Sequence, residues 1–232
     1  MFVQTATFAF TAGALIISTV GFLWFTTTGD YENDYLYLPP VITLLAGGAY
    51  TVMAASSSGV IAADIILEAR YADWLVTTPL IVAYLGLVAG AGRRTIAAAM
   101  AADAVMIVAG FAATTTGTAA VRWAGYGVSS IAFLALVYLF VTAFTDALGS
   151  VSAAAQGMFR TLRDLTIFLW FVYPIAWLFG PSAAGWISAV DYHFIVAILD
   201  MSAKIGFNLI IAFSLVRVTE LVDTTEQPET PA

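Results

Sequence analysis

Seven long runs of apolar residues occupy most of this 232-residue sequence, and they constrain its fold more than any other feature. A helix that crosses a membrane needs about 20 mostly apolar residues, because lipid offers backbone groups no hydrogen-bond partners. These runs are unbroken, whereas the strands of a membrane barrel would alternate apolar and polar residues. The sequence therefore predicts an all-α bundle of seven transmembrane helices, placed at 4–27, 36–57, 69–90, 95–115, 121–146, 160–180 and 190–218.

The composition excludes several classes of protein. Only 10% of the residues are charged and 61% are hydrophobic, whereas a soluble domain carries roughly 25% charged residues. The chain has no cysteine and one histidine, so we expect neither disulfides nor a metal centre built on thiolates or imidazoles. The net charge of -7 argues against a nucleic-acid partner. We expect an integral membrane protein that is not an enzyme.

Arginines indicate the orientation of the bundle. Five of them fall on one side of the predicted spans, namely Arg93, Arg94, Arg160, Arg163 and Arg217. Because cytoplasmic loops are enriched in basic residues, this distribution predicts an extracellular N-terminus. Residues 1–222 then form one membrane domain. The polar segment 223–232 contains two prolines and is predicted to be a disordered cytoplasmic tail.

Lys204 is the only lysine in the sequence, and it lies in the middle of the seventh predicted span. Ionisable residues at membrane depth cost several kcal/mol unless they are paired or hydrated, so each is a candidate for function. Lys204 is either one partner of a structural ion pair or the attachment point of an aldehyde as a Schiff base. Its spacing does not choose between the two. Asp200 precedes it by four residues, on the same helix face.

Two further clusters accompany the lysine. Arg70, Asp73 and Thr77 share one face of the third span, as a salt bridge that closes the extracellular end or as a carboxylate ready to take a proton from Lys204. The sixth span has a stripe of aromatic side chains around a proline that should bend the helix. This stripe is either core packing or, together with an aromatic residue of the third span, the wall of a flat apolar ligand. Its members are Trp170, Tyr173, Pro174, Trp177 and Trp74.

Three segments carry a resemblance along nearly the whole chain, namely RYADWLVTTP at 70–79, WFVYPIAW at 170–177 and LDMSAK at 199–204. They closely resemble the haloarchaeal microbial rhodopsins, seven-helix proteins of the cell membrane that respond to light. The resemblance implies retinal bound as a protonated Schiff base to Lys204, with Asp73 as the counterion that accepts the proton. It also implies that Asp200 is the second carboxylate and that 1–222 is the retinal-binding domain.

The resemblance extends to the surroundings of these groups. It implies that Arg70 orients an extracellular hydrogen-bond network, that Thr77 bonds Asp73, and that a tyrosine pair bonds Asp200. It identifies Asp103 with a buried, protonated aspartate that bonds Thr78. The residues implied to hold retinal are Tyr50, Met53, Trp74, Thr78, Met106, Gly110, Tyr126, Ser129, Trp170, Tyr173, Pro174, Trp177 and Ala203.

Differences from the pump bacteriorhodopsin indicate which group of rhodopsins the sequence resembles. Tyr84 stands where that pump has the aspartate that returns the proton, and a phenol is a poor acid at neutral pH. Ser182 and Tyr192 replace the two glutamates of its proton-release group, although Asp191 lies beside them. Both losses are typical of sensory rhodopsins. His193, the sole histidine, is expected to be a surface or interface residue and not a proton carrier.

Departures from the known sensors place the chain between the two groups. Ala203 replaces the threonine that precedes the lysine of blue-light sensors, and Ile198 replaces a tyrosine that faces their transducer. Phe133 lies near the position of a histidine found in orange-light sensors. This pattern resembles the group called middle rhodopsins.

The sequence leaves three functions to be distinguished by experiment. The preferred one is a retinal photoreceptor in which light isomerises retinal and the proton moves to Asp73. The second is a slow outward proton pump, because Asp73 is intact, and the third is a membrane scaffold or retinal carrier. Retinal and lipid are the expected partners. A transducer membrane protein and a homo-oligomer are further partners that the sequence does not decide.

Overall fold

A computed structural model describes residues 2–29, 31, 34–62 and 64–226, and its regular structure is helical. The elements are α1 (Phe2–Thr28), η1 (Asp34–Tyr37), α2 (Leu38–Ser57), α3 (Ile66–Val88), α4 (Arg93–Thr115), α5 (Ala119–Val141), α6 (Ala143–Ala147), η2 (Leu148–Ser150), α7 (Ala153–Phe179) and α8 (Ala189–Glu226). Seven stretches of these helices are long and apolar enough to cross a membrane. The predicted all-α class and the seven helices are confirmed.

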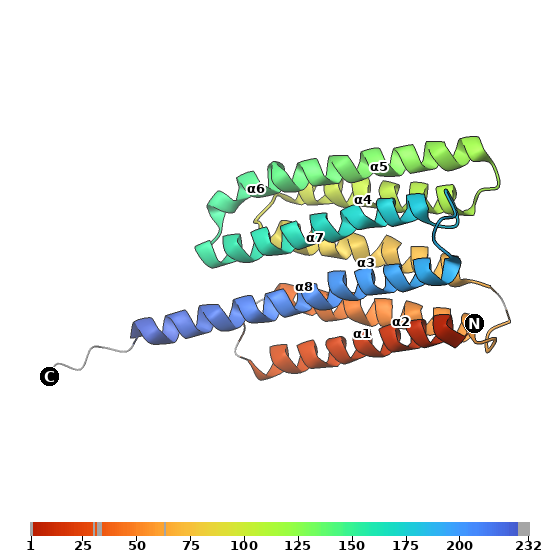
Figure 1. Ribbon diagram of the computed structural model, residues 1–232. Helices are drawn as coiled ribbons and strands as arrows, with labels where there is room; N and C mark the ends of the chain where they lie inside the picture. The colour runs from red at the N-terminus through yellow and green to blue at the C-terminus, as the bar shows by residue number, and fades with distance from the viewer. Residues whose placement is uncertain (1, 30, 32–33, 63, 227–232) are drawn as a thin grey trace.

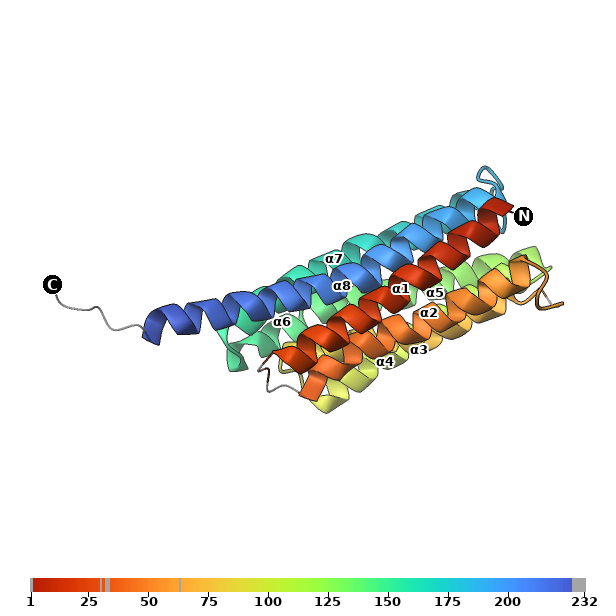
Figure 2. The same ribbon diagram turned by 90° about the horizontal axis from the view of Figure 1, so that it is seen from below.

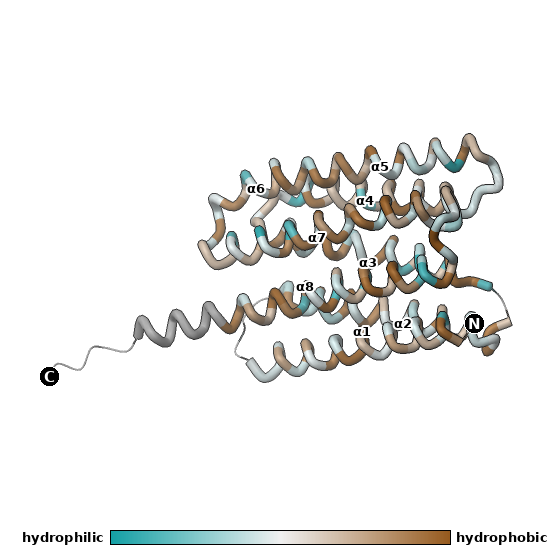
Figure 3. The backbone as a smooth tube through the Cα atoms, viewed as in Figure 1, coloured by the Kyte–Doolittle hydropathy of each residue, from teal (hydrophilic) through white to brown (hydrophobic). Residues whose placement is uncertain are grey.

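The helices lie roughly parallel to one axis and alternate in direction (Figure 1). The bundle therefore has two ends, which we call the Phe2 end and the Thr28 end after the first and last residues of α1. Viewed after a quarter turn, α1 lies beside α2 and α8, with α7 on the other side of α8 (Figure 2). Apolar residues are distributed along all seven long helices (Figure 3). Large apolar side chains such as Ile17, Ile131 and Phe168 are at least 69% exposed, as expected for surfaces that face lipid.

Most boundaries agree with the sequence prediction within two residues, and four differ by more. α7 begins at Ala153, seven residues before the predicted 160. α3 begins at Ile66, three residues before the predicted 69, because the apolar residues after the loop already join the helix. α5 ends at Val141, and Thr142, with φ -110 and ψ -89, separates it from α6. α8 continues to Glu226 and projects beyond the bundle (Figure 1). The first four residues of the predicted tail thus extend the helix, and 227–232 lie outside the described residues.

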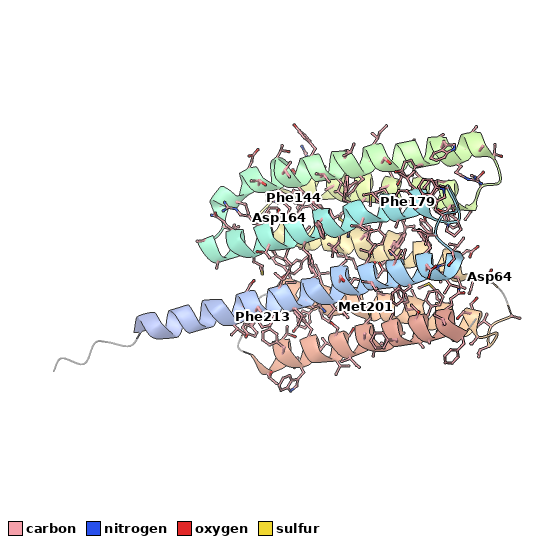
Figure 4. The ribbon with its side chains drawn as sticks, viewed as in Figure 1. Asp64, Phe144, Asp164, Phe179, Met201 and Phe213 are labelled. Carbon is pink, nitrogen blue, oxygen red and sulfur yellow. The ribbon has the colours of Figure 1, made fainter. Side chains whose placement is uncertain are left out.

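The interior is divided between polar and apolar regions. Charged residues are buried midway along α3 and α8, and side chains fill the space between the helices (Figure 4). Toward the Thr28 end an apolar core surrounds Tyr84, Phe144 and Phe207, each at most 1% exposed. Gly90, with φ +72, turns the chain from α3 into α4, a conformation that glycine adopts without steric cost.

Candidate functional site

Lys204 lies at the centre of the site, 2% exposed, between α8 and α3. Its Nζ donates to Asp73 Oδ2 at 3.0 Å and to Asp200 Oδ1 at 3.3 Å. Asp200 is one helical turn before the lysine, so α8 itself supplies one carboxylate, and α3 supplies the other. A buried amine that meets two carboxylates is a compensated charge, which is how an ionised group can occupy a membrane interior.

The two carboxylates differ in their remaining partners. Asp200 accepts hydrogen bonds from Tyr50 Oη at 2.6 Å, Tyr173 Oη at 2.8 Å and Trp74 Nε1 at 3.0 Å. These donors stabilise its charged form. By contrast, Oδ1 of Asp73 has no hydrogen-bond partner among the described residues. Asp73 is therefore the carboxylate with a free position for an added proton.

Arg70 does not form the intrahelical salt bridge with Asp73 that one interpretation of the sequence predicted. The guanidinium is 1% exposed, and no ion pair to it is found among the described residues. Instead, its Nη1 lies 2.9 Å from His193 Nδ1, and its carbon lies 5.9 Å from the centre of the Phe8 ring. Its Nε and Nη2 have no partner in the described part of the chain. Thr77 Oγ1 donates to the backbone carbonyl of Asp73 at 2.9 Å.

His193 was expected as a surface or interface residue, and the structure places it partly inside the bundle. The first turns of α8 pack against α1 and α3, and the imidazole is half-buried, 5.5 Å from the Phe8 ring and bonded to Arg70. A histidine that accepts at Nδ1 from a guanidinium carries its proton on Nε2. Asp191 is exposed and accepts a hydrogen bond from the Ser188 hydroxyl at 2.7 Å, so it does not contact Arg70.

Asp103 and Thr78 meet between α4 and α3, with 2.7 Å between Oδ2 and Oγ1. The same hydroxyl donates to the carbonyl of Trp74 at 2.7 Å. The Thr78 hydroxyl either shares its proton between these two acceptors, or donates to the Trp74 carbonyl and accepts from a protonated Asp103. Asp103 is fully buried, and this geometry agrees with the neutral carboxyl that the resemblance implies.

An elongated cavity extends from Lys204 between α3, α4, α5 and α7, with about 840 Å³ of space between its lining atoms, open margins included. Its walls are mostly aromatic. Trp74 and Tyr173 meet edge to face at 5.3 Å, and Tyr126 stacks on Trp177 at 4.8 Å. Twelve residues expected at a bound cofactor line it: Trp74, Thr78, Met106, Gly110, Tyr126, Ser129, Trp170, Tyr173, Pro174, Trp177, Ala203 and Lys204.

Two expected residues lie elsewhere, and six others were missed as lining residues. Tyr50 and Met53 pack with Phe8 in a neighbouring core cluster, and Tyr50 reaches the site only through Asp200. The additional lining residues are Tyr71, Ile81, Ile107, Ser130, Phe133 and Tyr192. Helical spacing contained a signal for Tyr71, which precedes Trp74 by three residues, and for Ile81, which follows Thr78 by three.

A hydroxyl on α4 fixes the far wall of the cavity. Thr114 Oγ1 accepts from Trp177 Nε1 at 2.9 Å, lies 2.7 Å from Tyr71 Oη and donates to the Gly110 carbonyl at 2.8 Å. One donated and two accepted bonds satisfy this hydroxyl completely. The indole and the phenol are thereby held in fixed positions. The aromatic side chains and the few polar groups of this lining suit a flat, apolar ligand attached at Lys204.

Fold and site together define a class of membrane protein, in which a seven-helix bundle holds an apolar ligand against a buried lysine paired with two carboxylates. The chain belongs to the bacteriorhodopsin-like family, whose model matches residues 2–218.

Individual proteins of this family are similar to the chain in sequence and in structure. Sensory rhodopsin III of Haloarcula marismortui is 38% identical over 215 residues, which cover 92% of each chain. A crystal structure of thermophilic rhodopsin from Rubrobacter xylanophilus has a TM-score of 0.83 at 33% identity, with 91% of this chain and 95% of that chain covered. The light-driven proton pump from Coccomyxa subellipsoidea has a TM-score of 0.81 at 26% identity, with 91% and 96% covered.

Membership in the family settles the cofactor and the location. Proteins of this family bind retinal through a Schiff base to a lysine, and Lys204 is the only lysine here. The predicted retinal cofactor and the multi-pass location in the cell membrane are confirmed. The family consists of photoreceptors and ion pumps, and this protein accordingly responds to light through retinal.

Proposed function

We propose that the protein is a sensory-type photoreceptor in which light moves the proton of Lys204 Nζ to Asp73. Bound retinal supplies the absorption of light and the isomerisation that changes the surroundings of the nitrogen. The carrying observation is the contact of 3.0 Å between Nζ and Asp73 Oδ2. Transfer across such a contact requires no movement of the backbone.

The surrounding residues have separate roles in this proposal. Asp200, stabilised by Tyr50, Tyr173 and Trp74, keeps its charge while Asp73 takes the proton. Arg70, held by His193, balances that charge from the Phe2 end. Thr77 fixes the α3 backbone at Asp73. The aromatic walls exclude water from the proton-transfer site.

The return of the proton distinguishes a sensor from a pump. Among the described residues, the buried carboxylates are Asp73, Asp103 and Asp200, and Asp103 is occupied by Thr78. Tyr84, at the position of the pump's donor, is packed edge to face against Phe207 in the apolar core. The absence of a nearby acid favours a state without the Nζ proton that lives long enough to signal.

A sensor also requires a partner that receives the signal. Ile198 lies on α8 at the position that faces the transducer in similar sensors, and its side chain is 43% exposed. An exposed apolar side chain is also expected where a helix faces lipid, so docking of a transducer membrane protein on α8 stays a prediction. Formation of a homo-oligomer stays a prediction. The alternative function, a slow outward proton pump, is supported by the intact contact between Lys204 and Asp73.

The two functions are separated by two measurements on the same cells. Flash spectroscopy gives the lifetime of the state without the Nζ proton, and a pH electrode records the light-driven acidification of the medium. We expect a long lifetime with little sustained acidification. Acidification that persists under light and disappears with a protonophore would favour the pump. Protein that stays colourless with added retinal would leave only a scaffold or carrier.

A further inference from the structure

A second buried polar group of residues lies toward the Thr28 end from Lys204, between α1, α2 and α8. Asn208 is 3% exposed, and its Nδ2 donates to Ser18 Oγ at 3.2 Å and to Thr43 Oγ1 at 3.5 Å. Thr43 Oγ1 in turn lies 2.8 Å from Thr19 Oγ1. We call Ser18, Thr19, Thr43 and Asn208 the α1–α2–α8 polar cluster. None of these side chains contributes to the site described above.

The cluster is close to Lys204. Asn208 follows the lysine by four residues, so the two side chains share one face of α8, one turn apart. On α2, Tyr50 bonds Asp200 and Thr43 bonds Asn208, which places Ala46 at the level of Lys204. Ala46 and its neighbour Gly47 are small, so no bulky side chain of α2 separates the lysine from the cluster.

The cluster also reaches the end of the bundle. Thr43 Oγ1 lies 3.3 Å and 3.2 Å from the carbonyls of Pro39 and Pro40, in the first turn of α2. Polar atoms therefore extend from the beginning of α2 to one turn from Lys204. The connection between α1 and α2 is acidic in sequence, with Asp30, Glu32 and Asp34.

The space beside α3 between the Thr28 end and Lys204 contains no comparable set of polar side chains among the described residues. Tyr84 and Phe207 are surrounded by the buried side chains of Leu85, Phe144 and Leu162. On α7 the buried Thr166 hydroxyl donates to the Leu162 carbonyl of its own helix. Thr19 and Thr43 also bond carbonyls of their own helices, but unlike Thr166 they contact each other across two helices. Buried polar side chains are costly in a membrane protein and commonly face water or an ion path. Three buried ones, Thr19, Thr43 and Asn208, joined by the partly buried Ser18, require an explanation beyond helix packing.

We propose that the α1–α2–α8 polar cluster conducts the proton that returns to Lys204 Nζ, in place of a carboxylic donor on α3. This inference rests on the proposed light-driven loss of that proton. A hydronium ion at the Thr28 end gives up a proton, which passes along water held by the hydroxyls and the amide to the lone pair of Nζ. Asn208 orients this water through its acceptor Oδ1, while its Nδ2 holds the hydroxyls of Ser18 and Thr43 in place, and it has no net change of protonation. It is a positioning residue.

The test compares Asn208→Leu with two control variants by flash spectroscopy. Thr166→Val removes a buried hydroxyl from the same half of the bundle, and Tyr84→Phe removes the phenol. We expect Asn208→Leu to prolong the state without the Nζ proton about tenfold, less than the roughly 10²-fold effect of a direct general acid because the amide acts through water. Thr43→Val should act in the same direction, and both controls should keep the wild-type lifetime.

Two additional readouts separate conduction from packing. Azide, a small diffusible acid, should restore the wild-type lifetime in Asn208→Leu, which a packing defect would not allow. In the retinal-free protein placed in D₂O, the infrared carbonyl band of the Asn208 side chain, assigned by its loss in Asn208→Leu, should shift rapidly as its N–H groups exchange. This exchange requires water in the cluster but no photochemistry.

The outcomes are distinguishable. A wild-type protein that never loses the Nζ proton in light would overturn the proposed function and this inference together. A normal lifetime in Asn208→Leu, or a prolonged one that azide does not restore, would overturn this inference alone. So would a side-chain amide that resists exchange in D₂O.

Discussion

Lys204 is the only side-chain amine of the chain, so no other residue can hold retinal as a Schiff base. Lys204→Ala should therefore be colourless with added retinal. Because this change leaves two buried carboxylates without their cation, Lys204→Arg is the matched variant: it keeps a positive charge but cannot form the bond. Both variants should lack a visible band in absorption spectra while circular dichroism shows intact helices. A visible band in either would contradict the assignment of Lys204.

Asp73 is expected to set the colour, because its charge lies 3.0 Å from Nζ and stabilises the ground state of the cationic chromophore. Asp73→Asn removes that charge with little change in shape, so the absorption maximum should shift to the red. Asp103→Asn is the control, since Asp103 bonds Thr78 and not the lysine; its maximum should move much less. A blue shift in a pigment that is still protonated at Nζ would contradict the counterion role.

His193 is expected to stabilise the buried guanidinium of Arg70. His193→Phe removes the acceptor at 2.9 Å from Nη1, and loss of a hydrogen bond to a charged group should lower the free energy of unfolding by about 2 kcal/mol. His193→Gln retains an acceptor and should lose less. Thermal unfolding in detergent measures both. Equal stability of the three proteins would show that the contact contributes nothing.

The elements were largely predictable because the lipid requirement acts on each helix separately. Runs of apolar residues identified all seven spans, and helical spacing placed Asp73 with Thr77 and Asp200 with Lys204 on common faces. Spacing within one helix does not reveal the neighbouring helix. For that reason the sequence suggested a salt bridge between Arg70 and Asp73, whereas α8 provides His193 as the contact of Arg70. The break at Thr142 was not predicted either, because a single threonine between apolar residues does not by itself indicate the end of a helix.

The cavity also depends on contacts between helices that spacing within one helix does not reveal. The aromatic stripe of α7 together with Trp74 of α3 indicated a wall. Thr114 of α4, however, lies in a run of threonines that is typical of a loop, and nothing in the sequence places it between Tyr71 and Trp177. The resemblance supplied most of the lining residues. It could not supply Asn208 and the polar cluster, which are particular to the packing of α1, α2 and α8.

On α3, the absence of a carboxylic acid at position 84 is expected to leave the medium as the source of the returning proton. Tyr84→Asp would place a carboxylic acid on the face where a pump has its donor, so the state without the Nζ proton should become shorter-lived. The aspartate would enter an apolar core, and a loss of stability is expected as well. Flash spectroscopy at several pH values measures the effect. In the wild type, decay should be faster at low pH, because the proton comes from the medium; rapid decay that is indifferent to pH would indicate an unidentified donor.

The whole molecule is expected to insert with its N-terminus outside the cell. Arg93 and Arg94 begin α4, and Arg160 and Arg163 lie in the early turns of α7, so all four lie toward the Thr28 end, as the positive-inside rule requires for a cytoplasmic face. The chain contains no cysteine, so single cysteines can be labelled without background.

Two exposed serines at opposite ends of the bundle provide the matched pair for this test. Ser58 follows α2 at the Phe2 end, and Ser150 ends η2 at the Thr28 end. A maleimide that cannot cross membranes should label Ser58→Cys in intact cells and Ser150→Cys only after lysis. The reverse labelling pattern would show that the bundle has the opposite orientation in the membrane. Proton transfer from Lys204 toward Asp73 would then point into the cell, and the polar cluster would take up its proton from outside, so the orientation decides which compartment each proton comes from and goes to.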